Sequence, residues 1–300
     1  LVDRSRAVIV HNEFARQRVL TSRPLAQVGT IPMPVETDLL LPPSAAEQRA
    51  RKLAFGLDPE AFLVASFGFV TPHKRLEVAL PAFARLRDSR PDAGFAIVGE
   101  VSPHYDFAAA LARYGAAGVR VVGRTAAATF DDWMRACDVA VNLRHPTGGE
   151  TSASFMRLLA FGRPTIVNQT GAFAEVPEGA CLQLPLDGFE ESTLVAYLRA
   201  LADRRPLAAG IGTQARAYAV ARHRAPAAAA ACLALLERAA ASGAPPFVAL
   251  PPLAPYPVSD PWPALLAVVG GELADLGLGE SDEELLAALA AQLQDLVAGE

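Results

Sequence analysis

The sequence has few of the residues that build disulfide frameworks and metal sites. Its 300 residues include three cysteines, Cys137, Cys181 and Cys232, which lie far apart, form no C-x-x-C pair and have no histidine cluster beside them. A disulfide framework or a zinc site is therefore not expected, and a reducing cytoplasm is the default compartment. We likewise expect no metal ion at the functional site and no resident cofactor.

Long apolar runs and an excess of positive charge are also missing. No stretch approaches the roughly 18 apolar residues of a membrane-spanning helix. The formal net charge of −5 does not favour a nucleic-acid partner. No lysine or arginine follows Arg238, whereas nine acidic residues do, so residues 1–238 carry +4 and the remainder −9. A solvated acidic tail explains this asymmetry, and a mildly basic body suited to an anionic small molecule is the alternative.

The sequence does contain a regular series of short apolar runs. From about residue 61 the runs are FLVASFG, GFAIVGE, VRVVGR, DVAVNLR, PTIVN and CLQLP, mostly separated by amphipathic segments. Continuous apolar runs are typical of strands buried on both faces, and intervening helices indicate parallel crossovers. We therefore predict a doubly wound, Rossmann-like α/β sheet, in which ligands bind at the carboxyl ends of the strands.

Shorter segments flank this series. RAVIVHN predicts a strand, EFARQRVL a helix, VGTIPMPVETDLLLPP an extended connection, and AEQRARKLAFGL a helix that ends near Gly56. Extra helices are expected near 190–203, 206–221 and 226–241.

The C-terminal part differs in composition from the rest. Residues 242–263 hold eight prolines and predict an irregular linker, followed by a helix over DEELLAALAAQLQDLV with Ser281 as its N-cap. We divide the chain into 1–45, 46–241 and 242–300.

The segment PTGGETSASFMRLLAFG follows the fourth apolar run and carries the strongest local signal. Gly149 and the glycine before it allow a tight turn and a close approach of a ligand. Thr151 or Ser152 can cap the helix that follows. The free N–H groups at Ser152, Ala153 and Ser154 and the helix dipole favour an anion.

Glu150 lies within this segment and would repel a phosphate group. Its carboxylate is better suited to accept hydrogen bonds from sugar hydroxyls beside the phosphate. The alternative is that Glu150 and Thr151 only stabilise the start of the helix.

Basic residues follow the first apolar run. In FGFVTPHKRLE, Gly68 ends the strand, and Lys74 and Arg75 are expected to open the next helix. Cations at a helix N-terminus are unfavourable, and a bound diphosphate would offset the repulsion. Solvated surface charge is the alternative.

Two further strand ends carry polar residues. Glu100 follows the second run and either contacts a ligand or caps the loop. Gly123 and Arg124 end the third run and either flank a base or phosphate or belong to the solvated surface.

Taken in order, these segments resemble the C-terminal, donor-binding half of the family-four retaining glycosyltransferases of the GT-B fold. The correspondence covers about residues 5–190, from AVIVHN through IPMPV, FGFVTPHKRLE, FAIVGE and VRVVGR to CLQLPLD. HPTGGETSAS resembles a subgroup in which a G-E-T-S segment replaces the common glutamate-rich signature. Enzymes of that subgroup often assemble cell-surface glycans.

The resemblance implies a hexosyltransferase that moves a sugar, with retention, from a nucleoside-diphosphate sugar to a glycan or lipid-linked acceptor. Lys74 falls where a family lysine contacts the diphosphate, and Glu150 where a glutamate meets the donor sugar. Thr151–Ser154 match the phosphate cradle, and Gly123 and Arg124 match the segment near the base. Lys74 and Glu150 are thus the expected catalytic residues, and polysaccharide biosynthesis is the expected process.

The sequence departs from the family pattern in three places. Phe69 stands where an arginine is common, and Arg75 is a candidate substitute. The family's second glutamate aligns with Arg157, or with Leu158 without a gap, so no carboxylate is expected at the ribose.

The third departure is the N-terminal acceptor domain, of which we expect only the last strand and helix over 1–45. Since the chain opens on Leu1, we expect a preceding segment, and any peripheral association with the inner face of a membrane would run through it. A non-catalytic nucleotide-sugar-binding module, or an epimerase of the same fold, is the alternative to a transferase.

Overall fold

A computed structural model describes residues 2, 5–115, 117–242 and 287. All but the last belong to one compact unit, Leu1–Pro246, and the second unit, Phe247–Glu300, lies almost wholly outside the described residues. The expected proline-rich linker, its following helix and the Ser281 cap therefore fall outside the description. The division at residues 45 and 241 stays a prediction.

The centre of the molecule is a six-stranded parallel sheet in the order β5-β4-β3-β6-β7-β8. Its strands are β3 Leu63–Phe67, β4 Gly94–Val98, β5 Val119–Gly123, β6 Val139–Val141, β7 Thr165–Asn168 and β8 Leu182–Leu184. Each lies within one of the six apolar runs, so the predicted strands and doubly wound fold are confirmed. The chain runs outward from β3 to β5, then returns to the centre and runs the other way from β6 to β8.

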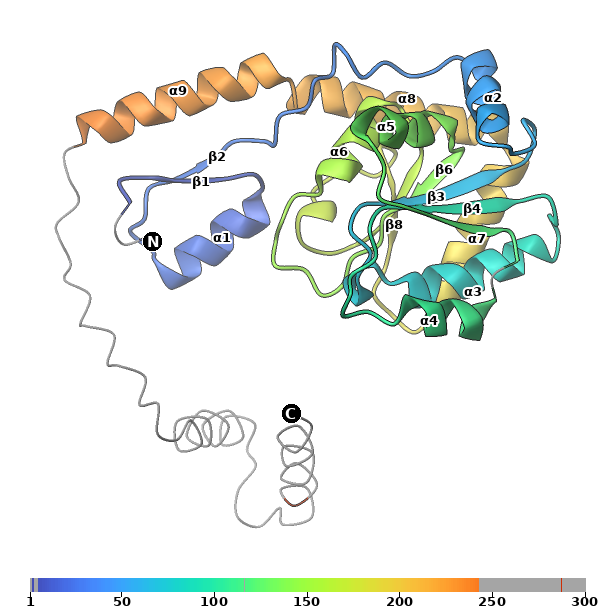
Figure 1. Cartoon of the computed structure of the whole chain (residues 1–300). Helices are drawn as coiled ribbons and strands as arrows, with labels where there is room; N and C mark the ends of the chain where they lie inside the picture. The colour runs from blue at the N-terminus through green and yellow to red at the C-terminus, as the bar shows by residue number, and fades with distance from the viewer. Residues whose placement is uncertain (1, 3–4, 116, 243–286, 288–300) are drawn as a thin grey trace. The chain divides into compact units, whose positions relative to one another are not determined.

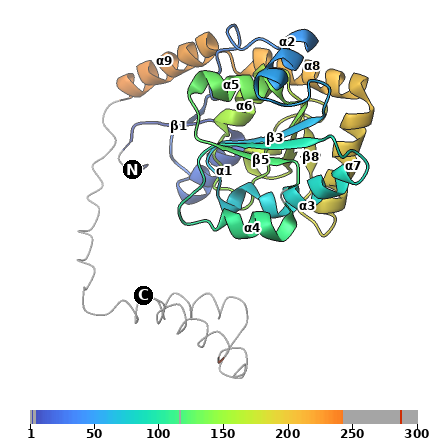
Figure 2. The same cartoon turned by 45° about the vertical axis from the view of Figure 1, so that its right-hand side comes forward.

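Helices cover both faces of the sheet (Figures 1 and 2). On one face lie α2 Ala45–Ala54, α5 Ala127–Ala136, α6 Ala153–Ala160 and α8 Arg205–Arg222. On the other lie α3 Leu76–Arg87, α4 Phe107–Tyr114 and α7 Glu190–Asp203. Because both faces are covered, all five residues of β3 are buried, which explains its uninterrupted apolar sequence.

The core is divided by the sheet into two apolar clusters. Ala65 and Phe67 of β3 point into the cluster that contains Phe155 of α6. Val64 points into the opposite cluster, beside Phe83 of α3. This alternation of successive side chains sets the direction of every residue at the carboxyl end of the strand.

Local sequence explains where α2 begins and ends. Ser44 and Glu47 form a capping box, with the Ser44 Oγ accepting from the Glu47 amide at 3.2 Å and the Glu47 carboxylate accepting from the Ser44 amide at 2.8 Å. Gly56 follows the helix with φ of 68°, as expected of a glycine after a helix end.

The N-terminal segment forms a separate pair of parallel strands, β1 Val8–Val10 and β2 Val28–Thr30, joined by α1 Glu13–Ser22. The strand and helix expected there are confirmed, whereas the connection expected over VGTIPMPVETDLLLPP contains β2. The last described helix, α9 Ala225–Ala241, packs Leu235 against Ile31, beside this pair.

Hydrogen bonds that involve the Asn12 and Glu175 side chains join the N-terminal segment to loops of the main unit. The Asn12 side chain caps α1 by accepting from the Ala15 amide at 2.7 Å and donates to the Gly149 carbonyl at 2.8 Å. The Glu175 carboxylate accepts from the Glu13 and Phe14 amides at 2.9 and 2.7 Å. The glycine-rich loop of GGETSAS is therefore tied directly to the start of α1.

Candidate functional site

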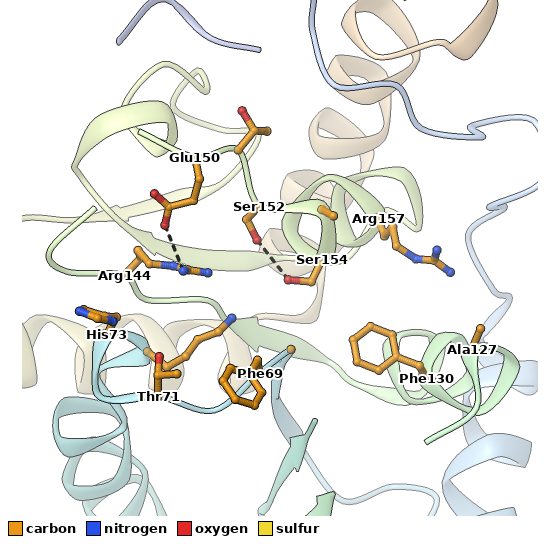
Figure 3. Close-up of a pocket in the computed structure, with 14 residues that line it drawn as sticks. Phe69, Thr71, His73, Ala127, Phe130, Arg144, Glu150, Ser152, Ser154 and Arg157 are labelled. Atoms are coloured by element: carbon orange, nitrogen blue, oxygen red, sulfur yellow. Dashed lines mark hydrogen bonds and ion pairs between the residues drawn. The ribbon is translucent and has the colours of Figure 1, made fainter. Parts of the chain in front are cut away.

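A pocket of about 560 Å³ opens where the strand order reverses, between the carboxyl ends of β3 and β6 (Figure 3). Such switch points are the usual ligand sites of open α/β sheets. The lining residues come from the loop after β3, the first turns of α5, and the loop from β6 into α6. They are Gly68, Phe69, Thr71, His73, Lys74, Ala127, Phe130, Arg144, Glu150, Thr151, Ser152, Ala153, Ser154 and Arg157.

The end of β3 is shaped by Gly68, which has φ of 98°. A Cβ built there would stand 3.5 Å from the Lys74 Nζ, on the approach to that ammonium group. The neighbouring strand end is equally tight, since a Cβ on Gly99 would lie 2.0 Å from the Gly68 carbonyl oxygen. The glycines therefore keep this edge of the sheet narrow, and Lys74 lies in the pocket lining beside Gly68.

Lys74 belongs to the turn that follows β3 and lines the pocket. A 3-10 turn, η2 Pro72–Lys74, precedes α3, and Arg75 lies between them in the left-handed region with φ of 52°. The expectation that Lys74 and Arg75 open the helix is therefore wrong, because α3 begins at Leu76. The turn buries Lys74, which is 4% exposed.

The Lys74 ammonium is held by two oxygens. Its Nζ donates to the Phe67 carbonyl at 2.6 Å and to the Asn142 Oδ1 at 3.2 Å. Burial, and secondarily the positive charge of Arg144, lower the pKa of Lys74 from its ordinary value near 10.5 to about 7. An anion in the pocket would raise that pKa again by stabilising the charged form.

The N-terminus of α6 forms the facing wall. Ser152 is the N-cap, with its Oγ accepting from the Phe155 amide at 3.3 Å, so the Ser152 alternative for the cap is the one observed. The Asn142 Nδ2 donates to the Ser152 Oγ at 3.4 Å, and the Ser152 and Ser154 hydroxyls are 3.1 Å apart. Asn142 thus links Lys74 to the start of α6. The Lys74 ammonium group and the N-terminus of α6 both place hydrogen-bond donors at the same pocket.

Glu150 lies beside this wall, with its side chain 45% exposed. Its carboxylate accepts from the Thr147 hydroxyl at 3.1 Å and the Gly148 amide at 2.9 Å, and it pairs with the Arg144 Nη1 at 3.0 Å. Desolvation opposes ionisation, but these hydrogen bonds and the Arg144 charge prevail and lower the pKa of Glu150. The carboxylate is therefore ionised at neutral pH, and hydrogen bonds from its own loop fix its orientation.

Arg144 lines the pocket and was not selected from the sequence, like Thr71, His73, Ala127 and Phe130. It follows the run DVAVNL directly, so the same rule that selected Gly68 and Lys74, a polar residue at a strand's carboxyl end, could have found it. Figure 3 shows Arg144 and Glu150 directed toward one another at one end of the pocket. Arg157 and Phe130 lie at the opposite end.

Arg157 lines the pocket, whereas its neighbour Leu158 is fully buried in the core. The Arg157 guanidinium forms an ion pair with Asp131 of α5. The structure therefore places a cation, paired with a carboxylate from another helix, where the family resemblance would place a glutamate.

Other predicted residues lie outside this lining. Both Arg75 Nη atoms donate to the Glu190 carboxylate at 2.7 Å, so its side chain is directed away to α7. Arg124 is 84% exposed and pairs with Glu100 across 3.6 Å at the surface beyond β4 and β5. Gly123 ends β5 on the same side.

Gly149 also lies just outside the lining, where it has a structural part. Its φ is 96°, and a Cβ there would approach the Phe14 ring to 2.8 Å. The Thr151 Oγ1 accepts from the Asn12 Nδ2 at 2.9 Å, so the two residues dock the loop on α1. Ser152, and not Thr151, is the N-cap of α6.

The arrangement of the sheet and its helices defines a class of fold, that of the GT-B glycosyltransferases. HepE from Anabaena in complex with UDP superposes with a TM-score of 0.66, at 17% identity over 78% of this chain and 64% of HepE. Sucrose-phosphate synthase from Thermosynechococcus elongatus gives 0.67, at 21% identity over 81% and 60%. The C-terminal domain of LpcC, a glycosyl transferase group 1 family protein from Francisella tularensis, gives 0.53 at 16% identity, over 64% of this chain and 99% of that domain.

A family model also matches part of the chain. Residues 60–204 match the family described as Glycosyl transferases group 1. No curated protein matches the chain. The chain spans less than two thirds of HepE and of sucrose-phosphate synthase. The GT-B fold expected from the sequence is confirmed, and the narrower G-E-T-S subgroup stays a prediction.

Two features concern membranes and metals. In the part of the chain that the structure describes, no helix is long and apolar enough to cross a bilayer. Among the same residues, no three His, Cys, Asp or Glu side chains gather in a way that could hold a metal ion.

Proposed function

We propose that this chain is the donor-binding part of a glycosyltransferase, which moves a hexosyl group from a nucleoside-diphosphate sugar to a glycan or lipid-linked acceptor. The observation that carries the proposal is the meeting of Lys74, Glu150 and the α6 N-terminus in one pocket at the switch point. The match of residues 60–204 to group 1 glycosyl transferases supports it. So do the UDP and UDP-glucose complexes of HepE, a protein of the same fold.

The roles follow from charge. Departure of a nucleoside diphosphate builds negative charge on the β-phosphate, and fixed donors directed at that charge lower the barrier. Lys74 and the amides at Thr151–Ser154 would supply these donors. Glu150 would accept hydrogen bonds from the sugar hydroxyls and orient the anomeric carbon. Retention, and catalysis without a metal ion, belong to the same proposal.

The cellular setting belongs to the same proposal. The resemblance of HPTGGETSAS to a cell-surface glycan subgroup supports polysaccharide biosynthesis in the cytoplasm. An acceptor would enter from a second domain facing the pocket, and contact with the inner membrane surface would run through that domain. The proposal places the acceptor face in a domain outside residues 1–300, so we expect these residues to bind the donor without transferring its sugar at the rate of a two-domain enzyme.

The test is calorimetric titration of the chain with UDP, GDP and ADP, then with the sugar conjugates of the nucleotide that binds. One of these nucleoside diphosphates should bind, and Lys74→Met should weaken it by about 1.5–3 kcal/mol, the range for a charge-assisted hydrogen bond. Arg205→Met, which removes an exposed cation paired with Glu60, is the control and should change nothing. No binding of any of the three would refute the proposal.

A non-catalytic nucleotide-binding module is the second candidate. Arg157, paired with Asp131 at the far end of the pocket, favours it, because neither Arg157 nor Leu158, the two residues aligned with the family's ribose-binding glutamate, is a carboxylate. Product analysis separates the readings. Release or transfer of the sugar supports the transferase, an unchanged conjugate supports the module, and a changed sugar still joined to its nucleotide indicates an epimerase.

A further inference from the structure

We propose that Arg144 is the second phosphate-binding cation of this pocket, and that it exchanges Glu150 for the diphosphate when the donor binds. Arg144, rather than Arg75, would thereby supply the second positive charge beside Lys74. This inference rests on the proposed function and adds to it a residue and a coupling between two parts of the donor.

Arg144 is held in position to bind a ligand and is not a solvated surface charge. Its backbone amide donates to the Asn168 Oδ1 at 2.9 Å, which fixes the loop after β6 to the end of β7. Its side chain is 22% exposed and lines the pocket. The Arg144 Nε is buried and has no hydrogen-bond partner among the described residues. A buried donor left unpaired is costly, and a ligand oxygen would satisfy it.

The charges of the pocket point the same way. The positive charge of Arg144 disfavours the charged form of Lys74, and Glu150 is the anion that pairs with Arg144. Arg157 already has Asp131 as its counter-ion. A diphosphate between Lys74 and Arg144 would relieve their repulsion, and a guanidinium can bind two phosphate oxygens at once.

The exchange gives Glu150 a second function. The Glu150 Oε1 faces Arg144 at 3.0 Å, while its Oε2 is held by Thr147 and Gly148 at 3.1 and 2.9 Å. Transfer of Arg144 to phosphate would free Oε1 and leave Oε2 in place. The freed oxygen, still fixed in direction, could then accept a sugar hydroxyl, so phosphate binding prepares the site for the sugar.

A series of hydrogen bonds connects Arg75 to Arg144, and on this basis we assign Arg75 as a positioning residue. The Glu190 Oε1 accepts from the Arg75 Nη1 at 2.7 Å and from the Asn168 Nδ2 at 3.1 Å. Asn168 in turn holds the Arg144 amide. Arg75 therefore acts on the pocket through Glu190 and Asn168, without entering it.

The experiment is calorimetric titration with the nucleoside diphosphate that binds and with the matching monophosphate. Arg144→Met should weaken diphosphate binding by about tenfold or more, with a smaller effect on the monophosphate. Arg144→Lys should recover part of the loss, and Arg205→Met should have no effect. Thermal unfolding of each variant checks that it is folded.

The coupling has its own signature in a double-mutant cycle. Glu150→Gln should tighten diphosphate binding when Arg144 is present, because the cation no longer has to leave a carboxylate, and should tighten it less in the Arg144→Met background, where only the repulsion between carboxylate and phosphate is removed. Arg75→Met should weaken binding alone and add little to Arg144→Met. Additive effects of Glu150→Gln and Arg144→Met would contradict the exchange. Additive effects of Arg75→Met and Arg144→Met would contradict the positioning role of Arg75.

The outcomes distinguish this inference from the function on which it rests. If the unaltered chain binds a nucleoside diphosphate and folded Arg144→Met binds it equally well, Arg144 is no ligand and the proposed function stands. If the unaltered chain binds none, both are overturned.

Discussion

Raising the pH from 7 to 9 should weaken nucleoside-diphosphate binding steeply, and Lys74 should be the cause. Burial and Arg144 lower the pKa of Lys74 to about 7, so about half of the molecules carry the charge at neutral pH. A diphosphate favours the ammonium form, which means that the complex holds more protons than the free protein. Binding therefore takes up a proton, and affinity falls as the pH rises above the free-state pKa.

The magnitude follows from the protonated fraction. Between pH 7 and 9 the charged fraction of Lys74 falls from about one half to about one hundredth, so the affinity should drop about fiftyfold, or about 2.3 kcal/mol. The phosphate contributes little over this range, because its second ionisation lies near pH 6 and is largely complete by pH 7. His73 also lines the pocket, so its substitution provides a control.

The assay is titration calorimetry from pH 7 to 9 in pairs of buffers with different heats of ionisation, which measures proton uptake directly. Lys74→Arg should bind with an affinity that hardly changes with pH, because a guanidinium stays charged throughout. His73→Gln should keep the full dependence. Equal affinity of the unaltered chain at pH 7 and pH 9 would show that a titrating Lys74 does not hold the diphosphate.

Two other substitutions test the site and the packing behind it. Glu150→Gln should preserve or tighten binding of the free diphosphate while it weakens discrimination among sugar conjugates, because the carboxylate serves the sugar; parallel losses in both titrations would favour a structural role at the start of α6. Gly212→Ala should lower the free energy of unfolding by about 1–3 kcal/mol, since its Cβ would lie 2.3 Å from the Gly162 carbonyl oxygen where α8 packs on α6. Gly210→Ala in the same helix meets no atom within 4 Å, so it should instead stabilise the protein, by up to about 1 kcal/mol. Chemical denaturation of the two variants compares them directly, and equal effects would contradict the packing argument.

The choice between neighbouring residues shows where sequence reasoning stops. Lys74 and Arg75 are adjacent, both are cationic residue types, and both were expected at the diphosphate. The left-handed backbone at Arg75, with φ of 52°, separates their directions, and Glu190, 115 residues further on, holds the Arg75 side chain. Neither the dihedral angle nor so distant a partner can be read from the local pattern.

Strand order decided which of the other candidates share a site. Gly68, Glu100 and Arg124 each follow an apolar run and look equivalent in the sequence. The order β5-β4-β3-β6 places β3 beside β6 and carries the ends of β4 and β5 to one side. The surface pair of Glu100 and Arg124 therefore lies outside the pocket lining.

The sequence by itself determined the layers of this protein and the edge at which a ligand can bind. Apolar runs and helical periodicity are local consequences of burial, and the carboxyl ends of parallel strands must share one edge, so Gly68, Lys74, Glu150 and Ser152 could be placed together in advance. Only the tertiary structure decided the pairing of Arg144 with Glu150, the burial that lowers the pKa of Lys74, and the direction of Arg75. These depend on side-chain directions and on the charge and dielectric environment made by segments far apart in the chain, which come together only when it folds.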